Sequence, residues 1–421
     1  MKNLKILHIT DFHLRHSSRL YYSTARKLNN GFIRNNFYVN ELSERDFEKK
    51  IIFFDKSNYN KKIIQIIENL NPAIIVLGHC SRIDLKTFEY IKKIHPDIKI
   101  SQWYVDSLIP TGPDYNSHLK TFYKYIDFVD CSFVTSDPLS LKFYNKINKK
   151  IFYIPNPSDI SIDNLKVDQI TNNIYDIFVA LSHGQHRATL KRFYKDERED
   201  FIMNLQEKLP DIIFDNYGIA NNQPVWGDQY YKRLSQSKMA LNLSRGLPFK
   251  WYSSDRISSF IPNGITTFID RATKLDDFFS DDEVAFYKNI NDLGNLIHEL
   301  KNNDKKRRRI GESLYIDFDG MVRYGPFVGV QLPKKLIWAK NDMSSILIGF
   351  YEKQVIDWIA SRELHFSTLI DIGSADGLYL AGILKAGLAD TAVGFESSKK
   401  GRISSRSILA MNNVHDRAVV M

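Results

Sequence analysis

The chain has 421 residues, of which 43% are hydrophobic and 25% charged, and its formal net charge is +9. This length predicts two or three domains, and the composition excludes an intrinsically disordered chain. The two cysteines exclude a disulfide framework, and no sequence pattern typical of a nucleic-acid-binding domain is present.

The sequence also restricts where in the cell the protein is expected to lie. The N-terminus turns polar too soon for a signal peptide, and no apolar run reaches the roughly 20 residues that span a bilayer. We therefore expect a cytoplasmic protein. The basic run Lys305–Arg309 is typical of a solvated helix end, and peripheral contact with anionic lipid headgroups is the alternative.

Short apolar runs alternate with helix-period segments in the first part of the chain, which is the pattern of parallel β–α–β units. The runs predict strands at Ile6–Ile9, Ala73–Leu77, Ile98–Trp103, Phe128–Thr135 and Ile151–Ile154. Helices are expected at Lys61–Leu70 and Thr87–Ile94, and Asn29-Asn30-Gly31 is expected to open another. These elements predict a Rossmann-like domain over residues 1–155, followed by a linker over 156–175.

A second alternating series predicts another Rossmann-like domain over residues 176–312. Its expected strands are Ile177–Ala180, Ile212–Phe214, Met239–Leu243 and Thr266–Ile269. Its expected helices are Arg198–Lys208, Asp228–Ser235, Asp255–Ile261 and Asn291–Leu300. A connecting segment with a helix at Ser344–Ala360 then occupies residues 313–365, and a further strand-and-glycine-turn pattern starts the segment 366–421.

Polar loops follow the strands of the second series and suit a phosphorylated ligand. Ser182-His183-Gly184 and Arg187 come after one strand, and Tyr217-Gly218 comes after the next. Ligands of open α/β sheets lie at the carboxyl ends of the strands, where amides and cations bind phosphate oxygens. An ordinary β–α loop is the alternative for each of these stretches.

The run from Asn242 to Gly264 is the most informative. A strand ends in Asn242, Ser244 and Arg245, and Ser254, Asp255 and Arg256 begin a helix that Gly264 closes. Capping by Ser254 and Asp255 is expected, and the helix N-terminus would offer amides to a diphosphate.

Leu241–Gly246 and Ser254–Gly264 resemble the donor domain of the spore-protein-type (CgeB-like) glycosyltransferases. The resemblance implies a GT-B fold, a nucleotide-sugar donor bound by the second domain, and transfer without a metal ion. The first domain would then bind the acceptor. This sequence has Ser259 where the family has a glutamate that holds donor hydroxyls, and Asp255, on the same helical face, is a candidate substitute.

Acceptor-side candidates follow the strands of the first domain. An inverting transfer needs a base for the acceptor hydroxyl, and Asp11, His13, His79 and Asp106 stand where one is expected. Asp106 and Asp11 are preferred, and a local cap or turn is the alternative for each.

The segment 366–421 resembles the opening of class I methyltransferases that use S-adenosylmethionine. The resemblance rests on a glycine turn and on a carboxylate after the next strand, which would hold ribose hydroxyls. The residues are Asp371, Gly373, Ser374, Asp376, Gly377 and Glu396. So small a sheet is expected to leave strand edges and apolar faces uncovered and to hold a cofactor poorly.

The sequence therefore predicts an α/β protein with two Rossmann-like domains and a partial methyltransferase-like segment. Its expected function is metal-independent transfer of a sugar from a nucleotide-sugar to a cell-surface polysaccharide or lipid-linked acceptor. One alternative is an S-adenosylmethionine-dependent methyltransferase with a non-catalytic sugar-binding domain. A non-catalytic carbohydrate-binding protein is another.

Overall fold

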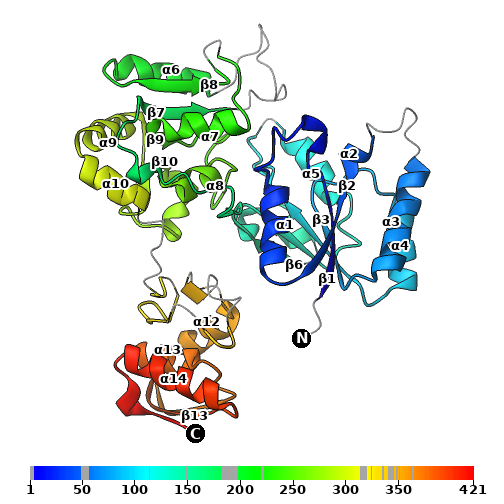
Figure 1. The fold of residues 1–421 in the computed structure, drawn as a ribbon, viewed down its shortest axis with the longest axis vertical. Helices are drawn as coiled ribbons and strands as arrows, with labels where there is room; N and C mark the ends of the chain where they lie inside the picture. The colour runs from blue at the N-terminus through cyan, green and yellow to red at the C-terminus, as the bar shows by residue number, and fades with distance from the viewer. Residues whose placement is uncertain are drawn as a thin grey trace. The chain divides into compact units, whose positions relative to one another are not determined.

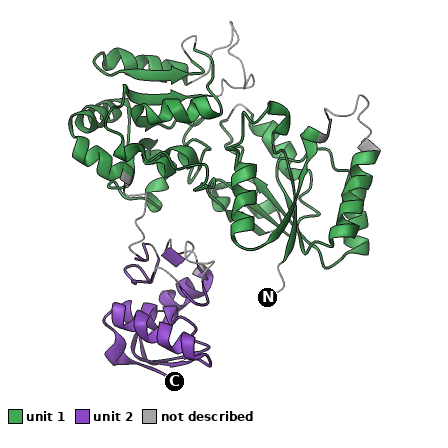
Figure 2. Cartoon of the chain, in the orientation of Figure 1, with its two compact units in different colours: residues 1–315 green, residues 316–421 purple. Residues whose placement is uncertain are grey.

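A computed structural model of the chain describes residues 4–48, 56–112, 114–147, 150–181, 198–219, 222–312 and 320–421, with 324, 334–335, 340–345, 348, 350 and 363–364 excepted from the last range. The chain forms two compact units, residues 1–315 and 316–421 (Figure 2). Each is described by itself below.

The first half of unit 1 is a six-stranded sheet in which all neighbouring strands are parallel, in the order β2-β1-β3-β4-β5-β6 (Figure 1). The strands are β1 (Lys5–Thr10), β2 (Tyr38–Ser43), β3 (Ile74–Leu77), β4 (Lys99–Tyr104), β5 (Cys131–Val134) and β6 (Lys150–Tyr153). The helices are α1 (Thr24–Arg34), α2 (Glu44–Glu48), α3 (Lys56–Leu70), α4 (Leu85–Ile94) and α5 (Tyr115–Tyr123). Apolar side chains of α3, α4 and α5 pack in the larger core cluster, and those of α1 pack in a separate one.

The second half of unit 1 is a five-stranded parallel sheet in the order β11-β10-β9-β7-β8. Its strands are β7 (Tyr175–Ala180), β8 (Phe214–Tyr217), β9 (Ser237–Leu241), β10 (Thr266–Asp270) and β11 (Ala285–Tyr287). Its helices are α6 (Glu199–Lys208), α7 (Asp228–Ser235), α8 (Ile257–Phe260), α9 (Ile290–Asn302) and α10 (Asp304–Glu312). In both sheets the strand order reverses beside the first strand, β1 or β7, and this is where doubly wound folds bind ligands.

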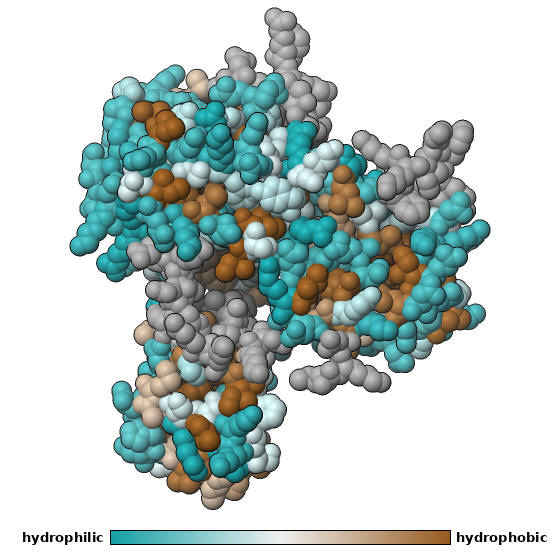
Figure 3. All heavy atoms as spheres, viewed as in Figure 1, coloured by the Kyte–Doolittle hydropathy of each residue, from teal (hydrophilic) through white to brown (hydrophobic). Residues whose placement is uncertain are grey.

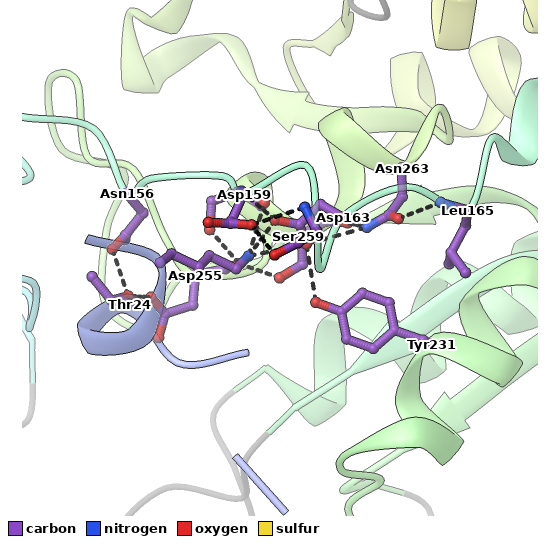
Figure 4. Close-up of polar contacts among 12 residues, drawn as sticks. Thr24, Asn156, Asp159, Asp163, Leu165, Tyr231, Asp255, Ser259 and Asn263 are labelled. Atoms are coloured by element: carbon purple, nitrogen blue, oxygen red, sulfur yellow. Dashed lines mark hydrogen bonds and ion pairs between the residues drawn. The ribbon is translucent and has the colours of Figure 1, made fainter. Parts of the chain in front are cut away.

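A buried polar cluster joins the two halves through the linker between them (Figure 4). Lys27 of α1 is 2% exposed, and its Nζ lies 2.8 Å from Oδ2 of Asp163, which is fully buried in the linker. The hydroxyl of Tyr231 on α7 donates to Oδ1 of Asp163 over 3.0 Å. Asn263 accepts the amide of Leu165 over 2.9 Å. The carboxylate of Asp163 therefore binds side chains from helices of both halves, and we call this cluster the Lys27–Asp163 junction.

Unit 2 contains a three-stranded parallel sheet in the order β12-β13-β14. The strands are β12 (Phe366–Ile372), β13 (Ala389–Phe395) and β14 (Ala418–Val420), and the helices are α12 (Lys353–Ser361), α13 (Leu378–Lys385) and α14 (Lys399–Met411). Side chains of α13 and α14 build the core. Ile370 and Ile372 of β12 are 63% and 85% exposed, and hydrophobic side chains are visible on the surface of this unit (Figure 3). The expected uncovered apolar surface is therefore present.

Several predicted boundaries are wrong. Asn29-Asn30-Gly31 lies inside α1, which begins at Thr24. The single helix expected at Ser344–Ala360 is interrupted, because Gly349 and Glu352 have φ angles of 69° and 42°, and α12 begins only at Lys353. Strands β2 and β11 were not predicted, and β11 is only three residues long. The expected α/β class with two Rossmann-like domains is confirmed.

Candidate functional site

A cavity of about 660 Å³ lies between the two halves of unit 1. Its walls come from segments that follow β1 and β4 in the first half and β7 and β9 in the second. The lining includes six arginines, Arg15, Arg19, Arg45, Arg198, Arg245 and Arg256, against three aspartates, Asp106, Asp114 and Asp255. The cavity therefore suits an anionic ligand.

Two guanidinium groups of the second half approach one backbone oxygen. Nη1 of Arg198 donates to the carbonyl oxygen of Leu243 over 3.2 Å, and Nη2 of Arg256 donates to the same oxygen. Burial and the charge of Arg198 lower the pKa of Arg256 to about 10, and Nε of Arg256 is buried without a hydrogen-bond partner. We call Arg198 and Arg256 the arginine pair. Because the two cations repel each other, an anion bound between them would relieve that cost.

The loop before α8 is organised differently from the prediction. Ser254 Oγ donates to Oδ1 of Asn242 over 2.7 Å, and Asp255 accepts a hydrogen bond of 2.8 Å from Thr24 of α1. Helix α8 has only four residues and no side-chain cap. The expectation that Ser254 and Asp255 cap it is therefore wrong, because their side chains bind other segments instead.

An ion pair across the cavity neutralises the charge of Arg245. Its Nη1 lies 2.6 Å from Oδ2 of Asp114, which belongs to the first half. Gly246 has a φ angle of 73°, and a Cβ atom there would come within 3.1 Å of the backbone of Gly112. Ser244 lines the cavity, and its buried hydroxyl has no hydrogen-bond partner. The two halves thus touch on this side of the cavity through an ion pair and two glycines.

The remaining donor-side candidates are distributed over several places. Ser259 lines the cavity, and its hydroxyl donates to the carbonyl oxygen of Asp255 over 3.0 Å. Gly264 ends the helical segment with a φ angle of 73°, as predicted, and it packs against Asp168 away from the cavity lining. Ser182, His183, Gly184 and Arg187 lie outside the described residues.

Tyr217 is placed at a second, smaller cavity of about 350 Å³, where Arg233 lies over its ring. A Cβ atom on Gly218 would collide with the backbone of Leu181, so this glycine serves close packing. The aromatic wall of the main cavity comes instead from Tyr22, Trp226 and Tyr230. Tyr22 and Tyr230, one from each half, stack with ring centroids 5.4 Å apart.

Asp11 and His13 follow β1, and Oδ1 of Asp11 accepts the backbone amide of His13 over 3.0 Å. Asp11 is 2% exposed and binds Arg15 through two contacts of 2.7 Å. Its Oδ2 lies 3.4 Å from Nδ1 of His13, which lines the cavity. Burial acts to raise the pKa of Asp11, but the hydrogen bonds and charge of Arg15, together with the charge and the backbone amide of His13, outweigh burial and lower the pKa. Burial lowers the pKa of His13, so its neutral form persists below the usual value of 6.5.

Asp106 and His79 form a second group, to which the structure adds His118. Nδ1 of His79 lies 3.4 Å, and Nε2 of His118 3.9 Å, from Oδ2 of Asp106. Asp106 and His118 line the cavity, whereas His79 stacks behind them on Tyr104, at 5.2 Å. Asp106 is therefore held between two imidazoles.

The carboxylates of the glycine turn in unit 2 bind the protein itself. Asp376 accepts backbone amides from Ile337, Trp338 and Ala339 over 2.9, 2.7 and 3.2 Å. Glu396 accepts the amides of Ala375 and Ser398 over 3.0 and 2.8 Å. Asp371 lies in β12 opposite Gly394 of β13, and burial raises its pKa. Gly373 has open space beside it, and the hydroxyl of Ser374 is buried without a partner.

No helix in the described part of the chain is long and apolar enough to cross a lipid bilayer. Nor do the described residues contain a group of three or more histidine, cysteine, aspartate or glutamate side chains arranged to hold a metal ion.

Residues 192–318 match the family described as Glycosyl transferase-like. No curated protein matches the chain by sequence. The match covers the arginine pair, Trp226 and the segment from Asn242 to Gly264, and thus most of the second half of unit 1.

Three solved structures illustrate the similarity of fold. An α1,3-fucosyltransferase is 9% identical with a TM-score of 0.41, over 85% of this chain and 91% of that one. Anabaena HepE in complex with UDP-glucose is 10% identical with a TM-score of 0.43, over 85% and 100%. The T4 phage protein BGT in complex with UDP and Mn²⁺ is 12% identical with a TM-score of 0.41, over 74% and 94%.

The sequence did not indicate several lining residues. Arg198 stands in a segment without a recognisable ligand motif, and His118 lies on α5. Arg15 could have been found, because it follows Asp11 by four residues, but only the turn between them brings the two side chains together.

Proposed function

We propose that unit 1 is a glycosyltransferase that moves a sugar from a nucleotide-sugar to an acceptor hydroxyl in the main cavity. The observation that carries the proposal is the arginine pair on one wall, in the segment that matches the Glycosyl transferase-like family, with His13 and Asp11 on the opposite half. The resemblance of Leu241–Gly246 and Ser254–Gly264 to the CgeB-like donor domain supports the same assignment.

The arginine pair would bind the diphosphate of the donor. As the bond between the anomeric carbon and the diphosphate oxygen breaks, its electron pair stays on that oxygen, and two guanidinium groups stabilise the new charge. They would do so in place of a metal ion, so we propose a metal-independent reaction. Tyr22, Trp226 and Tyr230 provide flat apolar surfaces for the base or the sugar.

His13 would accept the proton of the acceptor hydroxyl as its oxygen attacks the anomeric carbon. Oδ2 of Asp11 lies 3.4 Å from Nδ1 of His13, too far for a hydrogen bond, but its negative charge favours a proton on that nitrogen and would leave Nε2 as the base. The lowered pKa of His13 keeps the imidazole neutral at pH 7. Direct displacement of this kind inverts the anomeric centre. Asp106, the other preferred candidate, is paired with two imidazoles and would position the acceptor.

The proposed acceptor is a cell-surface polysaccharide or a lipid-linked glycan. Peripheral contact with an anionic membrane is also proposed, and the basic run at 305–309 is the segment that would make this contact. In it, Arg307 is buried against Asp304, and Arg308 donates to the carbonyl oxygens of Asp168 and Ile170. Lys305, Lys306 and Arg309 are exposed on α10 and remain able to meet lipid headgroups.

Methyl transfer by unit 2 is a second proposal. It is supported by the parallel β–α–β order and by the open space at Gly373. Both oxygens of Glu396 accept backbone amides. We therefore expect the main role of this carboxylate to be holding the turn in shape, with binding of a ribose second to it. Calorimetric titration of the whole chain with S-adenosylmethionine tests this second proposal. A heat of binding that the unaltered protein shows and Gly373→Val loses would support the proposal.

The experiment that tests the main proposal is calorimetric titration with UDP and GDP. Arg256→Gln removes a charge-assisted phosphate contact, worth about 1.5–3 kcal/mol, and should weaken nucleotide binding roughly 10- to 150-fold. Arg309→Gln, on exposed α10, is the matched control and should bind as the unaltered protein does. Equal affinities of all three proteins for the better nucleotide would refute the assignment of the arginine pair.

A further inference from the structure

The first half of unit 1 places more cationic than anionic groups at its end of the cavity. Arg15, Arg19 and Arg45 line the cavity together with His13 and His16. The carboxylates of the same segment, Asp11 and Asp46, are not among the lining residues. We call Arg15, Arg19 and Arg45 the acceptor-side arginines.

The nearby carboxylates are already engaged. Asp11 binds Arg15 through both oxygens, and the only ion-pair contact recorded for Arg45 among the described residues is 3.7 Å from Oδ2 of this same carboxylate. Asp46 accepts the backbone amides of Leu14 and Arg15 over 2.9 and 2.8 Å. One buried carboxylate therefore serves two arginines, while the other fixes the loop.

Arg19 and Arg45 face solvent inside the cavity. The side chain of Arg45 is 44% exposed, and that of Arg19 is also exposed. The guanidinium of Arg19 lies 5.5 Å from the ring centroid of Trp226, whose buried Nε1 has no hydrogen-bond partner. A ligand reaching this wall would meet two accessible cations, which favour a negative charge.

The donor diphosphate does not account for these groups, because the arginine pair stands in the other half and serves it there. The acceptor-side arginines line the same cavity as His13, which would take the acceptor proton. An acceptor that is neutral throughout would gain nothing from the exposed charges of Arg19 and Arg45.

We propose that the acceptor carries an anionic group, a phosphate or a carboxylate, close to the hydroxyl that receives the sugar, and that Arg19 and Arg45 bind it. This inference rests on the proposed function of the cavity and specifies its acceptor. It applies equally to a phosphate of a lipid-linked carrier, a phosphate of a polyol-phosphate polymer and the carboxylate of an acidic sugar.

The test uses the whole chain saturated with the better of UDP and GDP, so that the arginine pair is occupied. Glucose 6-phosphate, glucuronate and glucose are then titrated in a calorimeter at low salt. We expect glucose 6-phosphate or glucuronate to bind at least about tenfold more tightly than glucose, and the stronger of the two identifies the anion. Arg19→Gln/Arg45→Gln should abolish that preference without changing nucleotide affinity.

The matched control is Lys306→Gln/Arg309→Gln, which removes two exposed cations of α10 and should keep the preference. Equal binding of charged and neutral sugars to the nucleotide-bound protein would overturn the anionic acceptor and leave the nucleotide site standing. A preference that survives Arg19→Gln/Arg45→Gln would overturn the assigned residues. Failure to bind either nucleotide would overturn the proposed function, and this inference with it.

Discussion

The two halves of unit 1 share a parallel α/β fold but bury opposite charges around their common cavity. In the first half, a buried carboxylate, Asp11, holds a histidine and an arginine in place. In the second half, the arginine pair shares a single carbonyl oxygen, and burial lowers the pKa of Arg256 to about 10. The first arrangement stabilises a basic imidazole, and the second leaves positive charge that an incoming anion can neutralise.

This difference shows how one fold can supply both parts of a transfer reaction. The negative charge of Asp11 is balanced within the folded chain, because His13, Arg15 and Arg45 lie around it. The arginine pair is costly to bury without an anion. We therefore expect substitutions in the first half to change the rate and substitutions in the second half to change nucleotide affinity.

The largest expected effect is that of His13→Gln. Loss of a general base costs roughly 10²- to 10⁴-fold in kcat, and the KM for the donor should change by no more than about twofold. Because burial lowers the pKa of His13, kcat should be lost only as the pH falls through a value below 6.5. Rate measurements from pH 4.5 to 8.5 with a glycan acceptor check both points.

The corresponding control is His16→Gln. His16 also lines the cavity, with its ring centroid 5.8 Å from that of His13, whereas it is Nδ1 of His13 that lies 3.4 Å from Asp11. If the two substitutions slow the reaction equally, or if the acid limb persists in His13→Gln, then the base is another residue and Asp106 becomes the leading candidate.

The next effect concerns the Lys27–Asp163 junction, which keeps the two halves together. Lys27→Met leaves a fully buried carboxylate without its cation, and such a loss costs about 3–5 kcal/mol of unfolding free energy. Lys306→Met is the matched control, because Lys306 forms an exposed ion pair with Glu299 that is worth at most about 1 kcal/mol. Urea unfolding followed by circular dichroism gives both values, and similar losses would show that the junction contributes little.

The smallest expected effect is that of removing metal ions. If the arginine pair provides the charge that a divalent cation supplies elsewhere, treatment with EDTA should leave kcat within about twofold of its original value. Activity that disappears in EDTA and returns with Mn²⁺ would contradict this division between the halves. It would then place a metal beside Asp106, Asp114 or Asp255, the carboxylates of the cavity.

Local patterns in the sequence were enough to predict most strands of the two sheets of unit 1, except β2 and β11, and the loop that contains Arg245 and Arg256. They could not predict partners that come from distant segments. Ser254 and Asp255 have the composition of a helix cap, yet Asn242 and Thr24 bind their side chains. Arg198 meets Arg256 only because both reach the carbonyl oxygen of Leu243, and no short motif encodes such a meeting.

The glycine turn of unit 2 illustrates the same limit. Its β–α–β pattern is local and was correctly predicted. Asp376, however, binds a backbone segment 37 to 39 residues earlier in the chain, at Ile337, Trp338 and Ala339. That tertiary contact decides whether the carboxylate faces a ligand or a backbone amide. The spacing of residues in the sequence does not predict such a contact.

The position of Trp226 gives the protein an optical reporter of its own. Only five tryptophans are present in the chain, and Trp226 is the one that the described cavity wall contains, beneath the guanidinium of Arg19. A ligand that displaces water from the indole ring of Trp226, or that moves Arg19 away from it, changes the polarity around the excited state of the indole. Shifts in emission wavelength would then follow occupancy in real time, and Trp226→Phe would silence them, so that transient-state kinetics need no attached dye.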